Sequence, residues 1–192
     1  MIADDSELIA TASETVGPFF HFGLATDAAL GAVADRSVDG EFITIRFRIT
    51  DGDGQAVPDG LVEIWQVDGR GNAAVRPSSA AAPAFRGFGR LPTGEDGTCE
   101  FETVRPGRVS DGEGGLQASH INVCLFARGL LRQVHTRVYF KGDPAIDEDA
   151  VLALVPAGRR PTLLATEDPH QPGRWLFDVR LQGEDETVFF DV

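Results

Sequence analysis

A polar face on a strand-like segment is the feature of this sequence that could carry chemistry. Residues 119–140 contain no proline, are rich in β-branched and aromatic residues, and alternate in period two. The pattern predicts two paired strands joined by a tight turn at Arg128-Gly129. One face of the predicted hairpin carries imidazole, amide and guanidinium groups: His120, Asn122, His135 and Arg137. Such a face could be a binding site, and a face that only contacts solvent would alternate in the same way.

Metal binding is the first chemistry that histidines suggest. His120 and His135 could meet across the hairpin if its register allowed it, but two imidazoles alone form a poor metal site. The other histidines, His21 and His170, stand far apart in the sequence. The sequence also lacks the CxxC, HExxH and GxSxG patterns and a glycine-rich phosphate loop between a strand and a helix. Pattern alone therefore predicts no self-sufficient active site.

Short alternating segments separated by turns must position these groups. The 192 residues include 22 glycines and 11 prolines, and long helical periodicity is scarce. These features favour one all-β domain over residues 1–192, folded as a β-sandwich with long loops. One short helix is expected at residues 147–154, with Asp147 as its N-cap. Further strands are expected in five segments: residues 41–50, 61–67, 98–104, 175–181 and 187–192.

Residues 1–24 are expected to form an N-terminal arm. Residues 1–14 are polar and acidic, whereas residues 15–24 are rich in phenylalanine and contain Gly17-Pro18, which should interrupt any regular element. Apolar side chains in an irregular segment need a surface to pack against. That surface could belong to the arm's own domain or to a partner chain.

Charge and cysteine content narrow the function classes. The net charge of -13 argues against a nucleic-acid partner, because no basic patch is available for phosphates. No apolar run is long enough to span a membrane, and the acidic N-terminus does not resemble a signal peptide. Cys99 and Cys124 stand in separate strand-like segments, which suits two buried thiols better than a disulfide. We therefore expect a cytoplasmic protein with no membrane partner.

Seven short motifs occur in an order that resembles the intradiol ring-cleaving dioxygenases. Each motif is weak alone, but the ordered set is specific and covers essentially the whole chain. The resemblance implies a β-sandwich core with long loops. It is closest to the alpha chains of the family, which pair with a homologous beta chain. The motifs are Gly17-Pro18 in the aromatic arm, residues 61–66, residues 85–90, Asp96-Gly97 before a strand, residues 105–107, residues 119–122 and residues 135–140.

The resemblance also implies an Fe(III) centre, but not on this chain. Catalytic chains of the family hold Fe(III) with two tyrosines and a His-x-His pair. The matching positions here are Ala73, Val109, His120 and Asn122, so only His120 keeps a ligand type. Anionic phenolates suit Fe(III), and the single tyrosine, Tyr139, stands too deep in the hairpin to replace them. The four positions are therefore read as vestigial, and the iron is expected on the partner beta chain.

The family's alpha chains line the entrance to the partner's iron site with an arm and a hairpin arginine. By motif, the arginine is Arg137, and the arm residues are Thr15, Gly17, Pro18 and Phe19. Two plainer interpretations stay open. Arg137 could be an ordinary strand arginine that pairs with an acidic group, and the arm could serve packing alone.

The resemblance implies an aromatic diol substrate, 3,4-dihydroxybenzoate. Dioxygen would cleave its ring between the hydroxyl-bearing carbons and give 3-carboxy-cis,cis-muconate. A different substituted catechol and a β-sandwich binding module without enzymatic activity are alternatives. A self-sufficient iron dioxygenase is a third, which the tyrosine count disfavours. Association with a tyrosine-bearing homologue would separate the enzyme subunit from the binding module.

Overall fold

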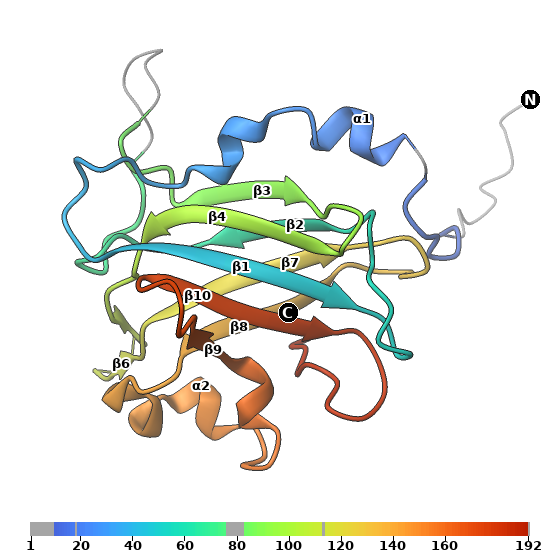
Figure 1. Ribbon diagram of the computed structural model, residues 1–192. Helices are drawn as coiled ribbons and strands as arrows, with labels where there is room; N and C mark the ends of the chain where they lie inside the picture. The colour runs from blue at the N-terminus through green and yellow to red at the C-terminus, as the bar shows by residue number, and fades with distance from the viewer. Residues whose placement is uncertain (1–9, 18, 76–82, 113, 192) are drawn as a thin grey trace, which may run out of the picture.

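The computed structural model describes residues 10–17, 19–75, 83–112 and 114–191. Within them, eight strands form one sheet in the order β3-β2-β7-β8-β9-β10-β1-β4 (Figure 1). A further short pair, β5 (Val109–Ser110) and β6 (Leu116–Gln117), lies apart from this sheet. The strands of the sheet are β1 (Phe42–Thr50), β2 (Leu61–Trp65), β3 (Phe88–Pro92), β4 (Thr98–Val104), β7 (His120–Phe126), β8 (Val134–Phe140), β9 (Leu164–Glu167) and β10 (Arg174–Arg180).

The sheet folds over on itself and encloses the main hydrophobic core. Its two halves, β3-β2-β7-β8 and β9-β10-β1-β4, are joined by a short parallel pairing of β8 with β9. Alternate residues of each strand point inward, because side chains in a strand repeat with period two. The main core includes Ile43, Ile45, Phe47 and Ile49 of β1, Val62 and Ile64 of β2, and Ile121, Val123 and Leu125 of β7. The predicted all-β, sandwich-like fold is confirmed.

The helices are short and lie at the margins of the sheet (Figure 1). None of the helices in the described residues is long and apolar enough to cross a membrane. Two α-helices occur there, where the sequence predicted one. The helices are α1 (Phe20–Leu24), α2 (Ala150–Ala153) and the 3-10 helices η1 (Ala28–Gly31), η2 (Pro144–Glu148) and η3 (Arg160–Leu163).

The helix α1 is the unexpected element, because residues 15–24 were predicted to be irregular. The Phe20 amide donates to the Gly17 carbonyl at 3.1 Å, which closes a turn just before the helix. The His21 ring then bonds the Asp59 carbonyl through Nε2 at 2.9 Å and holds the helix against the domain.

The predicted hairpin is present as β7 and β8, but its connection is longer than a tight turn. A turn does form at the predicted place, where Gly129 has a φ of 90° and the Leu130 amide donates to the Ala127 carbonyl. However, β7 already ends at Phe126 and β8 begins only at Val134, so residues 127–133 form the connection. The end of the chain also differs from the prediction, since Phe190 makes only an isolated bridge to His135.

The register of the hairpin keeps the two histidines apart. Tyr139 stands opposite His120, and His135 stands opposite Cys124. The two-histidine site considered from the sequence is therefore not formed. The same register places Asn122 opposite Arg137, which matters for the site described below.

The two cysteines are free and buried, as the sequence suggested. Burial raises the pKa of both Cys99 and Cys124 to about 12. Both therefore stay protonated at neutral pH and behave as small apolar side chains.

The sequence predicted Asp147 as the N-cap of the helix at residues 147–154, but this prediction is wrong: Asp149 caps α2. The Asp149 carboxylate accepts the Leu152 amide at 2.7 Å. It also accepts the Ala118 amide at 2.8 Å and the Tyr139 hydroxyl at 3.1 Å. The Asp149 residue is only 1% exposed. One buried carboxylate thus joins α2 to the segment just before β7 and to the end of β8.

We expect Asp149→Ala to lower the free energy of unfolding by about 3 kcal/mol or more, because it leaves buried donors of Ala118 and Tyr139 unpaired. Asp147→Ala is the matched control, since Asp147 is exposed, and its effect should stay within about 0.5 kcal/mol. Urea denaturation followed by circular dichroism measures both variants. Equal effects of the two substitutions would contradict the assignment of the cap.

Candidate functional site

The four positions that the sequence predicted to be vestigial meet at one cavity beside the ends of β2, β3 and β7. The cavity has a volume of about 490 Å³, and Ala73, Val109, His120 and Asn122 all line it. They come from three separate parts of the chain: the loop after β2, the strand β5, and β7. The structure therefore brings together all four positions that the sequence singled out.

Two glycines bring the loops that carry Ala73 and Val109 together. A Cβ atom on Gly107 would lie 2.5 Å from the Gly71 amide nitrogen, so only glycine fits there. Gly71 has a φ of 84° and packs equally closely against the Arg108 carbonyl. The Asp68 carbonyl accepts the amides of Gly71 at 3.0 Å and Gly107 at 2.8 Å, which fixes this approach.

The His120 ring has a defined orientation in the cavity wall. Its Nδ1 lies 2.8 Å from the Ala118 carbonyl, so Nδ1 carries the proton and donates it. Nε2 is then left as an acceptor. Burial is the main cause that lowers the pKa of His120, with a smaller contribution from the Arg137 charge, while the bond to Ala118 opposes the shift. The imidazole is therefore neutral at neutral pH.

The residues at this cavity do not fit Fe(III). The side chains of Ala73 and Val109 have no donor atom, and the Asn122 amide is a weak, neutral ligand. His120 alone offers a single nitrogen. Nowhere in the described residues do three or more His, Cys, Asp or Glu side chains gather in a way that could hold a metal ion. The cavity therefore brings together the four positions that the resemblance singled out, but it offers no ligand set for Fe(III).

The sequence did not predict the other residues that line the cavity, and three of these have large side chains: Trp65, Arg86 and Phe88. The rings of Trp65 and Phe88 lie 5.1 Å apart between centroids. The alternation of residues 61–67 placed Trp65 on the face opposite Val62 and Ile64, and this outward aromatic was the available signal. Arg86 precedes β3 in an irregular segment, where no periodicity could indicate its direction.

Arg137 lies in a neighbouring cavity of about 340 Å³. Asn122 lines both cavities, so they share one wall. The Arg137 guanidinium is half-buried and donates through Nη1 to the Gln117 side-chain oxygen at 2.8 Å. It also lies by the hydroxyl of Tyr139, whose pKa burial raises to about 12. Arg137 forms no ion pair with any carboxylate in the described part of the chain.

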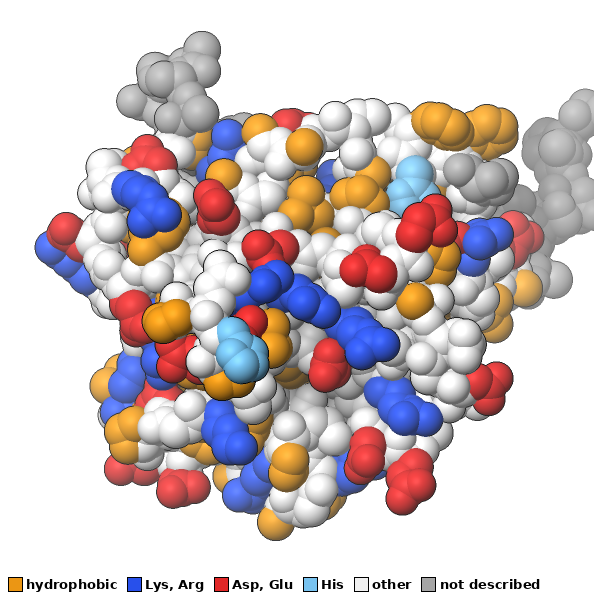
Figure 2. All heavy atoms as spheres, in the orientation of Figure 1, with side chains coloured by type: hydrophobic (Ala, Val, Ile, Leu, Met, Phe, Trp, Pro, Cys, Tyr) orange, Lys and Arg blue, Asp and Glu red, His pale blue; other side chains and the backbone are white. Residues whose placement is uncertain are grey.

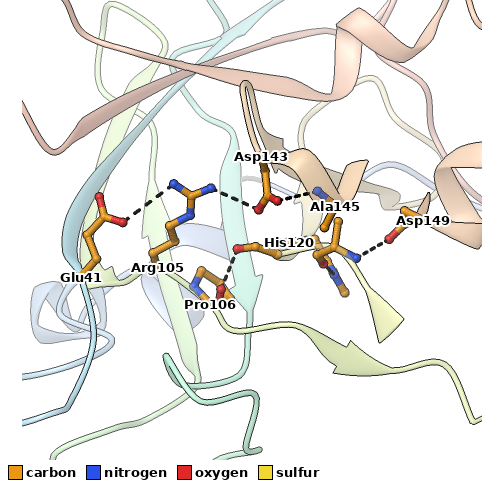
Figure 3. A network of polar contacts seen from close by, with 9 residues as sticks. Glu41, Arg105, Pro106, His120, Asp143, Ala145 and Asp149 are labelled. Carbon is orange, nitrogen blue, oxygen red and sulfur yellow. Dashed lines mark hydrogen bonds and ion pairs between the residues drawn. The ribbon is translucent and has the colours of Figure 1, made fainter. Parts of the chain in front are cut away.

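The loop beneath the first cavity is held by a second arginine. Arg105 lies between Asp143, at 3.2 Å, and Glu41, at 3.8 Å (Figure 3). Its guanidinium also stacks over the Phe140 ring, 4.8 Å from the centroid. The next residue, Pro106, accepts the Ser119 hydroxyl at 2.6 Å. These contacts fix residues 105–107, and hence the approach to β5, against the start of β7.

The arm residues lie at another place on this chain. The Thr15 hydroxyl accepts the Gly129 amide at 2.8 Å, at the loop between β7 and β8. Gly17 lines a small cavity with Arg128, and Phe19 is 78% exposed. Pro18 lies outside the described residues. No contact or cavity of the described residues joins this arm to Arg137.

Comparison with known proteins defines the family. A family model described as "Dioxygenase" matches residues 15–183. The dioxygenase domain of a dioxygenase carbohydrate-binding protein fusion from Streptomyces sp. SirexAA-E has the same fold, with a TM-score of 0.61 and 22% identity over 94% of this chain and 96% of that one. The chain belongs to the intradiol dioxygenase family.

Two relatives are more specific. The chain is 44% identical to the protocatechuate 3,4-dioxygenase alpha chain of Burkholderia cepacia, over 95% of this chain and 97% of that protein. It is 31% identical to the protocatechuate 3,4-dioxygenase beta chain of the same organism, over 91% of this chain and 77% of that protein. The alpha chain is thus the nearer of these two in both identity and length.

The lowered pKa of His120 predicts a pH dependence of stability. Below its ordinary value of 6.5, the unfolded chain takes up a proton at this residue before the folded chain does. The contribution of His120 to stability is therefore present above pH 6.5 and is lost as the pH falls below it. Urea denaturation from pH 7.5 to 5 should show a steeper loss for the wild type than for His120→Asn. The exposed His170 provides the control: His170→Asn should keep the wild-type steepness, and a parallel change in all three proteins would contradict the assignment.

The ligand positions also predict that the chain alone binds no Fe(III). Ala73 and Val109 supply no phenolate, so no phenolate-to-iron charge-transfer band should form. The isolated chain should be colourless and should contain far less than one iron per chain after loading and desalting. Iron analysis and visible absorption test this expectation. A stoichiometric, coloured ferric site would show it to be wrong.

Proposed function

We propose that this chain is the alpha, non-iron-binding subunit of a protocatechuate 3,4-dioxygenase. One observation carries the proposal: the chain aligns almost end to end with an alpha chain at 44% identity, while the cavity at its metal-ligand positions offers one imidazole and no phenolate. The Fe(III) then belongs to a homologous beta chain. The two buried free thiols suit a reducing compartment such as the cytoplasm.

The reaction of the complex would be intradiol cleavage of 3,4-dihydroxybenzoate. Both atoms of O2 enter the product, 3-carboxy-cis,cis-muconate, as the bond between the hydroxyl-bearing carbons breaks. When bound by the beta chain, Fe(III) would chelate the two phenolic oxygens and activate the ring toward O2. The contribution of the alpha chain is to bind and orient the part of the substrate that the iron leaves free.

Arg137 is the residue that we assign to the substrate carboxylate. A desolvated carboxylate needs a cationic partner, and a guanidinium stays charged and can bind both oxygens. Arg137 is suited to this role because no carboxylate of the described residues neutralises it. Its bond to Gln117 restrains the side chain and leaves further N–H donors free.

The arm supplies a surface for the beta chain. Phe19 and Phe22 are 78% and 75% exposed, and their ring centroids lie 6.1 Å apart. Hydrophobic side chains are gathered over α1 on the face seen in Figure 2. Exposed aromatic pairs of this kind are typical of protein interfaces. We assign Thr15, Gly17, Pro18 and Phe19 to contacts with the partner's pocket, alongside Arg137.

We expect Arg137→Ala, in the complex with the beta chain, to weaken binding of 3,4-dihydroxybenzoate by roughly 2–5 kcal/mol. Unsubstituted catechol has no carboxylate, so its affinity should change little. Iron content and colour should stay intact, because no iron ligand is touched. Steady-state cleavage kinetics with both substrates, together with iron analysis, measure these effects.

Arg132→Ala is the control, because Arg132 is exposed in the loop before β8 and its loss changes the net charge equally. It should leave both substrates unaffected. Equal losses for both substrates in Arg137→Ala would indicate a structural role at the interface. A chain that fails to co-purify with a tyrosine-bearing beta chain would contradict the proposed function as a whole.

A further inference from the structure

The cavity that has lost its metal ligands is unusual in its charge. The chain has 30 acidic residues and a net charge of -13, yet none of the Asp and Glu residues that the structure describes lines this cavity. Among the described residues that line it, Arg86 is the one with a charged side chain. In the described part of the chain, the Arg86 guanidinium makes no hydrogen bond and no ion pair. A half-buried, unpaired cation in a cavity without carboxylates favours an anionic ligand.

Two aromatic side chains form an apolar wall of the same cavity. Trp65 is 42% exposed, although it is a large apolar residue at the end of β2, which is paired on both sides. Phe88 lies beside it, with the centroids 5.1 Å apart. Phe88 is held in place by the Arg90 guanidinium, which lies over its ring at 5.3 Å and pairs with the buried Glu63. This wall is a fixed surface for an aromatic ring.

Two further polar side chains of the cavity, His120 and Asn122, can form hydrogen bonds with a ligand. His120 donates through Nδ1 to Ala118, so its Nε2 can accept a hydrogen bond from a ligand hydroxyl. The Asn122 amide has no hydrogen-bond partner in the described residues and can donate or accept. Ala73 and Val109 are small, and the volume of about 490 Å³ lies in the range of small-molecule sites.

We infer that this cavity binds a small aromatic carboxylate that carries a ring hydroxyl, without a metal ion. Arg86 takes the carboxylate, Trp65 and Phe88 take the ring, and His120 takes the hydroxyl. The inference goes beyond the proposed function, because it needs neither the beta chain nor its Fe(III).

The test uses 4-hydroxybenzoate as the probe and the full chain as the protein. The chain has two tryptophans, and Trp175 is buried in the core, so Trp65 is the one that a ligand in the cavity can contact. We expect saturable 1:1 binding by calorimetry and a matching change in tryptophan fluorescence. Trp65→Phe should keep the calorimetric binding and lose the fluorescence change. In the complex with the beta chain, the difference between wild type and Trp65→Phe isolates the signal of this cavity.

Arg86→Gln should weaken binding of 4-hydroxybenzoate by about 10- to 100-fold, as expected for a lost hydrogen bond to a charged group. Arg48→Gln, on the outer face of β1, removes the same charge and should leave binding unchanged. The neutral 4-hydroxybenzamide should bind the wild type more weakly than the acid, and Arg86→Gln should bind both about equally. Benzoate, which lacks the hydroxyl, should bind several-fold more weakly.

Three results would overturn the inference. The first is the absence of saturable binding to the wild type. The second is equal weakening by Arg86→Gln and Arg48→Gln, which would indicate only the overall charge. The third is binding that leaves the fluorescence of Trp65 unchanged. Equal affinity for benzoate and 4-hydroxybenzoate would contradict the assignment of His120 to the ring hydroxyl.

Discussion

The buried carboxylate of Asp149 is the interaction on which the functional part of this molecule depends. It accepts hydrogen bonds from Ala118, Tyr139 and Leu152, which belong to three segments that are distant in the sequence. Burying a charge is costly unless its hydrogen bonds are made, so the folded state tolerates Asp149 only when all three segments are in place. Ala118 in turn offers its carbonyl to His120. The orientation of the imidazole is therefore a consequence of how α2 packs against the hairpin.

The position of the cavity is set by backbone, and its chemistry is set by side chains. Gly71 and Gly107 approach so closely that neither could carry a Cβ atom, and this approach puts Ala73 near Val109. This approach depends on the backbone and not on the identity of the side chains at positions 73 and 109. Under the proposed function, alanine and valine can therefore occupy two positions that the resemblance assigns to iron ligands without disturbing this backbone approach.

The strands could be predicted from the sequence because a strand with one buried face alternates apolar and polar residues with period two. Ile43 to Ile49 and Ile121 to Leu125 alternate, and the structure buries the apolar set in each case. The cap of α2 could not be predicted in this way. Asp147 and Asp149 are equivalent locally, and only the tertiary bonds to Ala118 and Tyr139 distinguish them. Arg86 was missed for a similar reason, since it reaches the cavity from an irregular segment.

The two faces of the hairpin explain how its polar side chains can change while its geometry is kept. The inward face carries Ile121, Val123, Val138 and Phe140, which are buried in the main core. A shift of one residue would turn this set toward solvent, so the core fixes the register strongly. The register then places Asn122 opposite Arg137 on the other face, where Asn122 lines both cavities. A substitution on that face alters what the cavities bind, but it leaves untouched the contacts that hold the strands in register.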